Sequence, residues 1–317
     1  MIELLIQNGG NIYSPIIEGN VVLDLERKQT GKLTFNVVKD GIISYTEGNS
    51  VSLKVNNQKM FYGFVFTKSR DKEKIIGNVA YDQIRYLKNK DTYVYTNKTA
   101  SEIVRMIAND FRLKVGNIED TKFVIPRRVE DNQTLLDMIL NALDDTLLHS
   151  KTMFVLYDDF GELTLKNIEN MRLNLVIDEE TGENFSYTSS IDEQTYNRIK
   201  LAYENEETGK RDIYIAQDGE NINQWGVLQL FDTLKDPIQG KAKADALLAF
   251  YNQKTRRLSI SGAFGDVRVR PGCAVVIDLH LGDIVIGNFM MVEKVRHIFS
   301  NDLHTMDLQL IGGDFVV

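Results

Sequence analysis

Polar and apolar positions alternate with period two over long stretches of this chain, most clearly toward its two ends. In the C-terminal stretch, Met306, Leu308 and Leu310 alternate with polar residues, which predicts a strand with one face in solvent. Before it, "RVRPGCAVVIDL" places Pro271 and Gly272 where a β-turn, with Gly272 at positive φ, would lead into a strand. Toward the N-terminus, similar short runs predict strands at residues 2–6, 21–25, 32–38, 51–55, 60–66, 74–80 and 91–95.

The middle of the chain changes to a helical period. Thr99 and Glu102 have the spacing of a capping box, and the apolar residues that follow recur on one helical face. Thr134 begins a second stretch of the same kind, and two apolar runs on either side of residues 158–161 predict a hairpin. The sequence therefore predicts an all-β domain at residues 1–95, followed by a small α/β insert at residues 96–177.

An acidic segment follows the insert. Residues 178–195 carry no Lys or Arg but six carboxylates, namely Asp178, Glu179, Glu180, Glu183, Asp192 and Glu193. Together with its Ser, Thr and Gly residues, this charge predicts a linker or an exposed loop. Residues 196–317 return to strand patterns and contain one helix at about residues 236–252, with Asp236 as N-cap and Pro237 at the first helical position. The expected fold class is mainly β with an α/β insert.

Composition narrows the class of protein. The 317 residues are 43% hydrophobic and 26% charged, which is typical of a globular chain of two or three domains. The single Cys273 excludes an internal disulfide framework, and neither a signal peptide nor a membrane span is expected. The net charge of −8 argues against a protein that grips nucleic acid. We expect the chain to fold in a cytoplasm.

The residues that could carry catalysis or bind metal do not form a recognisable motif. His149, His280, His297 and His304 show no zinc-ligand spacing, and no phosphate-binding or nucleophile motif occurs. The pairs Asp144–Asp145, Asp158–Asp159, Glu179–Glu180 and Glu206–Glu207 could serve a glycosidase, but solvated loop charge explains them more simply. We therefore expect no enzyme activity, no catalytic residues, no metal and no cofactor.

Two further groups of residues are candidates for contacts between subunits. The run "MFYGFVF" contains Phe61, Phe64 and Phe66, and it is apolar on both faces, which indicates a strand that is buried on both sides or lies at a subunit contact. Arg256, Arg257, Arg268 and Arg270 form a basic cluster that could touch DNA in a channel. In an acidic chain, pairing with carboxylates of a neighbouring subunit is the favoured interpretation. Trp225, the only tryptophan, is a further candidate for such a contact.

The order and spacing of several stretches resemble the tail hub proteins of contractile-tailed phages and related bacteriocins, specifically the XkdQ/YqbQ family of PBSX-like prophages. These stretches are "TYNRIKLAY", "WGVLQ", the capped helix after Asp236, "VRPG", "FMMVEKVRHIF", "HTMDLQL" and, in the insert, "FVLYDDFGELTLKNIE". Together they cover most of residues 96–317. The N-terminal domain matches by architecture rather than by motif, and it shows no counterpart of the helix after Asp236.

The resemblance implies two tail-tube-like β-barrels in one chain, separated by an inserted domain. It further implies a homotrimer, in which three copies form a pseudo-sixfold ring between a hexameric tail tube and a trimeric spike. The expected partners are therefore the tube protein, the spike protein, other baseplate proteins and the tape measure, with no specific nucleic-acid binding and no membrane. The expected location is the baseplate of a phage or bacteriocin particle assembled in the bacterial cytoplasm. The alternative is a tail-associated cell-wall hydrolase or a peptidoglycan-binding module.

Overall fold

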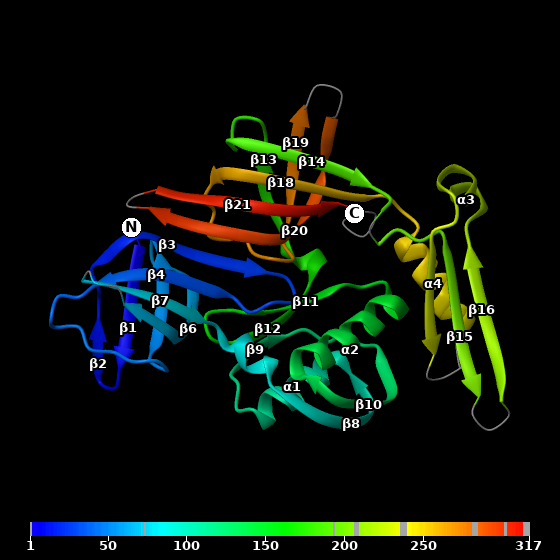
Figure 1. Cartoon of the computed structure of the whole chain (residues 1–317), viewed down its shortest axis with the longest axis horizontal. Helices are drawn as coiled ribbons and strands as arrows, with labels where there is room; N and C mark the ends of the chain where they lie inside the picture. The colour runs from blue at the N-terminus through cyan, green and yellow to red at the C-terminus, as the bar shows by residue number, and fades with distance from the viewer. Residues whose placement is uncertain are drawn as a thin grey trace.

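The structure is a computed structural model, and it describes residues 2–70, 72, 74–192, 194–205, 209–234, 240–280, 285–300 and 303–312. Two β regions lie next to each other, an α/β domain lies beside the first, and a small sheet with a helix stands apart at one end (Figure 1). The fold class predicted from the sequence, mainly β with an α/β insert, is confirmed.

The first β region contains seven strands: β1 (Ile2–Asn8), β2 (Asn11–Tyr13), β3 (Ile17–Glu26), β4 (Lys32–Val38), β5 (Ser50–Val55), β6 (Gln58–Arg70) and β7 (Ile75–Tyr81). Their alternating apolar residues, among them Leu23, Leu33 and Phe35, form one buried core. Asn56 and Asn57 both take positive φ between β5 and β6, as a tight hairpin turn requires.

The α/β domain contains η1 (Gln83–Lys88), β8 (Lys90–Thr99), α1 (Ala100–Asp110), β9 (Val115–Ile118), β10 (Val124–Thr134), α2 (Leu135–Ser150), β11 (Phe154–Asp158), β12 (Leu163–Asn167) and η2 (Ile168–Met171). The capping box of Thr99 and Glu102 and the N-cap of Thr134 are both present. The domain begins before residue 96, because the strand predicted at 91–95 is part of β8 and pairs with β10 instead of joining the first β region.

The second β region contains β13 (Arg172–Ile177), β14 (Asn184–Ser190), β18 (Thr255–Phe264), β19 (Ala274–His280), β20 (Val285–Ser300) and β21 (Leu303–Gly312). The prediction of a linker at residues 178–195 was wrong, because β14 lies within it and pairs with β18 over seven residue pairs. Phe185 and Tyr187 of β14 pack against the core of the second β region. This packing stabilises the strand although its sequence is rich in Ser and Thr. Likewise β13, which was expected in the insert, pairs with β19.

The described residues between 196 and 251 do not join the second β region. They form β15 (Arg198–Asn205), β16 (Lys210–Gln217), α3 (Gly219–Trp225), β17 (Gln229–Leu234) and α4 (Gly240–Tyr251). The three strands make a separate sheet, which packs against α4 through Ile199, Leu201 and Leu247. The single domain predicted at residues 196–317 is therefore divided by this unit. Asp236 and Pro237, the predicted start of the helix, lie outside the described residues.

The two β regions repeat one strand order. In the first, the strands follow each other in the sheet as β3, β4, β7, β6, β5 and β1, and in the second as β14, β18, β21, β20, β19 and β13. The unit that contains α4 is an insertion between β14 and β18, where the first region has only a tight turn between β3 and β4. Because β20 also pairs with β3, both regions belong to one 13-stranded sheet, in which the described strands pair in an open order (Figure 1).

Candidate functional site

The junction between the two β regions is a strand pair with a surface of complementary charge. β20 and β3 pair antiparallel from Lys294 opposite Glu26 to Phe299 opposite Val21. Arg296 binds Asp24 at 2.7 Å on the outer face, and Lys294 lies 3.1 Å from Glu26. Burial raises the pKa of Asp24, but the hydrogen bond and charge of Arg296 outweigh it and hold this pKa below its ordinary value.

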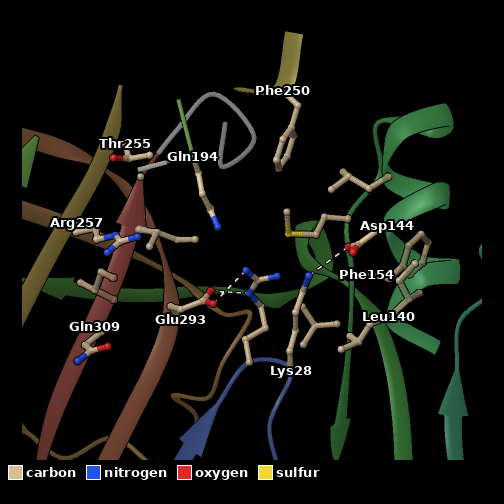
Figure 2. A pocket seen from close by; sticks show the side chains of 18 of the residues that line it. Lys28, Leu140, Asp144, Phe154, Gln194, Phe250, Thr255, Arg257, Glu293 and Gln309 are labelled. Carbon is tan, nitrogen blue, oxygen red and sulfur yellow. Dashed lines mark hydrogen bonds and ion pairs between the residues drawn. The ribbon is translucent and has the colours of Figure 1, made fainter. Parts of the chain in front are cut away.

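A groove of about 710 Å³ lies where the two β regions, the α/β domain and α4 meet. Figure 2 shows Leu140, Phe154 and Phe250 on its helical side, with Lys28 reaching Asp144 across it at 3.2 Å. On the opposite side, Arg27 holds Glu293 with two hydrogen bonds, of 2.5 and 3.1 Å. Because Asp144 and Glu293 are both ion-paired, neither is arranged as a free acid or base facing this groove.

The aromatic run of β6 divides between two faces. Phe61 is 3% exposed and lies in the core of the first β region, so its side chain is not available to another subunit. Phe64 and Phe66 are half-buried on the opposite face. There the ring centroid of Phe66 lies 5.4 Å from that of Tyr81 and 6.0 Å from that of Tyr86. Neighbouring Tyr62 packs against the β11–β12 turn of the α/β domain. The two apolar faces noticed in the sequence thus have different neighbours.

Two arginines of the basic cluster, Arg268 and Arg270, have acidic partners inside the chain. Arg268 binds Asp266 at 2.5 Å, and Arg270 binds Asp159 at 3.3 Å while its guanidinium lies over the Tyr157 ring. The hypothesis that both arginines pair with carboxylates of a neighbouring subunit therefore loses its main support. Trp225 is half-buried at the end of α3, away from the other candidates, in the unit that contains α4.

Two histidines that are seven residues apart in the sequence meet in the second β region. Nδ1 of His297 lies 2.9 Å from Nε2 of His304, and Nε2 of His297 lies 3.0 Å from the Val269 carbonyl oxygen. Complete burial, followed by the neighbouring His304, lowers the pKa of His297 to about 3. Neutral His297 therefore donates to Val269 and accepts from His304, an arrangement that fixes the segment before Pro271. The sequence spacing gave no sign of this pair.

A second missed pair consists of two carboxyl groups, Asp82 and Asp158. Asp82 is 4% exposed and accepts hydrogen bonds from the backbone N–H groups of Gly31 and Ile84. Asp158 was expected in a solvated turn, but its Oδ2 is buried without a hydrogen-bond partner. Burial raises the pKa of Asp158 to about 6, and burial together with the charge of Asp158 raises the pKa of Asp82. This pair lies between the first β region and the α/β domain.

Little else in the described residues is arranged for chemistry. They contain no cluster of three or more His, Cys, Asp or Glu side chains that could hold a metal ion. Among the helices they form, none has the length and apolar character needed to cross a membrane. The feature that stands out is the strand junction itself, with a groove beside it.

Comparison with known proteins agrees with this architecture. A family model described as YQBQ-like matches residues 21–311. The phage-like element PBSX protein XkdQ of Bacillus subtilis is 32% identical over 286 residues, which are 87% of this chain and 86% of that protein. Among solved structures, the 43 kDa tail protein of prophage MuSo2 from Shewanella oneidensis has a TM-score of 0.74 at 13% identity and covers 99% of this chain and 100% of its own. A tail protein from Neisseria meningitidis has a TM-score of 0.72 at 12% identity, with coverage of 99% and 98%.

Proposed function

The chain belongs to the YQBQ-like family, and we propose that it is a structural protein of a phage-type tail, the hub of the baseplate. The similar proteins support the proposal: they are a phage-like element protein and tail proteins with the same fold. In this proposal the chain acts by assembly and not by catalysis.

The observation that carries the proposal is the repeated strand order of the two β regions, joined edge to edge at β20 and β3. Two similar units that meet head to tail can repeat the same contact with the next chain. A head-to-tail contact closes into a ring when its rotation divides the full circle. Three chains would then supply six similar units, which fits a hexameric tube on one side and a trimeric spike on the other.

The proposed partners follow from this position. The chain would contact two further copies of itself, the tube protein above, the spike protein below and neighbouring baseplate proteins. Its place would be the tail tip of a phage or bacteriocin particle. The ion pairs Arg27–Glu293 and Lys28–Asp144 would hold the domains of one chain together while the ring contacts act between chains.

Averaged electron cryomicroscopy images of the assembled tail tip test the proposal directly. We expect three copies of the chain in one ring, each contributing two β regions. Six copies, or one β region per chain in the ring, would contradict the hub function. A second measurement addresses the alternative: purified chain incubated with peptidoglycan is expected to release no muropeptides, and release would show a hydrolase.

A further inference from the structure

Strands β6 and β20 occupy the same place in the two β regions and share an irregularity. The first half of β6 pairs with β5 and its second half with β7, just as β20 pairs first with β19 and then with β21. In the second half, one residue of each strand is left out of the pairing. This residue is Phe66 in β6 and Glu293 in β20, and both follow a buried valine. The matching bulges place Phe66 where β20 has Glu293.

The two strands differ in what lies on their other side. Beyond the bulge, β20 pairs with β3 through residues 294–299. The equivalent residues of β6, Thr67–Arg70, pair with β7 on one side, and the described residues provide no strand for the other side. β14, the equivalent of β3, pairs with β18 alone and ends the described sheet (Figure 1). Among the described residues, each copy therefore has two strand edges without a partner strand, and such edges favour association.

We propose that Thr67–Arg70 of β6 pair antiparallel with Tyr187–Ser190 of β14 in a second copy of this chain. The inference rests on the proposed function, and it names the strands that make the contact between copies. The strand directions agree with this pairing. Three successive antiparallel pairs lead from β14 through β18 and β21 to β20, and three lead from β3 through β4 and β7 to β6. β14 is therefore oriented relative to β20 as β3 is relative to β6, so β6 and β14 of two copies would be antiparallel like β20 and β3.

The register follows from the pairing of β20 with β3. Matching the β18–β21 ladder to the β4–β7 ladder gives Thr188 of β14 the position that Asp24 has in β3. Matching the two bulges gives Ser69 of β6 the position that Arg296 has in β20. Arg296 and Asp24 are paired on the outer face, and Ser69 and Thr188 are both exposed. The facing pairs between copies are then Thr67–Ser190, Lys68–Ser189, Ser69–Thr188 and Arg70–Tyr187.

The side chains next to the bulge support the same register. Inside the chain, Arg27 follows β3 and binds Glu293 of the β20 bulge, through both backbone and side chain. The equivalent residues at the edges are Ile191, which follows β14, and Phe66 of the β6 bulge. Both are half-buried in the single chain, so an apolar contact replaces the ion pair. This difference between the two contacts keeps β14 from competing with β3 for the edge of β20, because Glu293 would then face Ile191.

A cysteine pair tests the register. Residues directly opposite in antiparallel strands have Cβ atoms about 4.5–5.5 Å apart, and a small local shift brings them to the roughly 4 Å that a disulfide needs. In assembled particles, S69C/T188C chains are expected to form disulfide-linked multimers on mild oxidation, while each single variant stays monomeric on a denaturing gel. The control S69C/S189C is expected to stay unlinked, because a shift of one residue turns the second thiol to the other face. The native Cys273 is buried and does not interfere.

Replacing the apolar pair Phe66 and Ile191 with a charged pair tests the bulge contact independently. Phe66→Glu alone is expected to abolish the ring, because it sets a carboxylate against Ile191 of the next copy. Phe66→Glu combined with Ile191→Arg rebuilds the Glu293–Arg27 pair between copies and is expected to restore assembly. Because Phe66 also packs on Tyr81 and Tyr86, some loss of stability is expected, and cooperative thermal unfolding of the isolated variants above the assay temperature shows that loss of the ring is not loss of the fold.

The two proposals fail in different ways. A three-copy ring with efficient S69C/S189C linkage, or with no linkage of S69C/T188C, overturns the strand pairing and leaves the hub function standing. A ring of another copy number overturns the hub function whatever the linkage. Failure of Ile191→Arg to rescue Phe66→Glu overturns the bulge contact.

Discussion

At the scale of single residues, the turn before β19 combines backbone strain with tight packing. Gly272 has φ of 90°, and Cys273 N–H donates to the Arg270 carbonyl at 3.1 Å, as the sequence predicted for a Pro-Gly turn. A Cβ at this position would also lie 2.8 Å from Cγ2 of Val155 in the α/β domain.

Substitution of Gly272 is therefore expected to destabilise the fold. Gly272→Val should lower the free energy of unfolding by about 1–3 kcal/mol through strain, and Gly272→Ala by less. Gly10→Ala is a matched control, because a Cβ there meets no atom within 4 Å. Urea denaturation measures all three, and equal stability of the Gly272 variants and the native chain would contradict the turn.

Asp158 gives the molecule a predictable response to pH. Its pKa is about 6 in the fold and close to 3.9 in an unfolded chain, so between these values the folded state holds more protons. Stability contributed by the protonated carboxyl is therefore present below pH 4 and is lost as pH rises through about 6.

Asp158→Asn should remove this dependence. The variant is expected to gain about 1–3 kcal/mol relative to the native chain between pH 4.5 and 7.5. Urea denaturation at both pH values measures the gain, with Asp278→Asn, which alters an exposed carboxyl on β19, as control. A constant difference between native chain and Asp158→Asn at both pH values would show that Asp158 is not buried as described.

At the scale of elements, the sequence predicted well where local chemistry decides the structure. Thr99 and Glu102 satisfy each other's backbone at the start of α1, and this signal needs no tertiary information. β14 was missed for the opposite reason. Its serines and threonines resemble a loop, and only the packing of Phe185 and Tyr187 on a distant core makes it a strand.

The cap of α1 provides the prediction at this scale. Oγ1 of Thr99 accepts from Glu102 N–H at 3.3 Å, and Glu102 accepts from Thr99 N–H at 2.8 Å. Thr99→Ala leaves the donor at Glu102 without its partner and should cost about 1 kcal/mol in the free energy of unfolding. Thr96→Ala, at an exposed position on the same strand, is the control and should change stability little. Equal effects of the two substitutions would argue against the cap.

At the scale of the whole molecule, sequence order and spatial order diverge. The strand pattern of residues 196–234 suggests continuation into the second β region, yet these residues form a separate sheet between β14 and β18. Likewise, His297 and His304 meet across the pairing of β20 with β21, and Asp82 and Asp158 meet because the α/β domain packs on the first β region. Periodicity reports which residues of one element share a face, but it does not report which element lies beside another.

Charge distribution over the whole molecule leads to the last prediction, which concerns DNA. The chain has 45 acidic against 37 basic residues, and Arg268, Arg270 and Arg296 already bind carboxylates of the same chain. Because the net charge is −8 and these arginines are already paired, duplex DNA should bind no more tightly than about 1 μM at physiological salt. Fluorescence anisotropy over a salt series measures this. Asp159→Asn/Asp266→Asn, which releases two of the arginines, should bind more tightly than the native chain. Submicromolar binding by the native chain, with a steep salt dependence, would instead show a nucleic-acid surface.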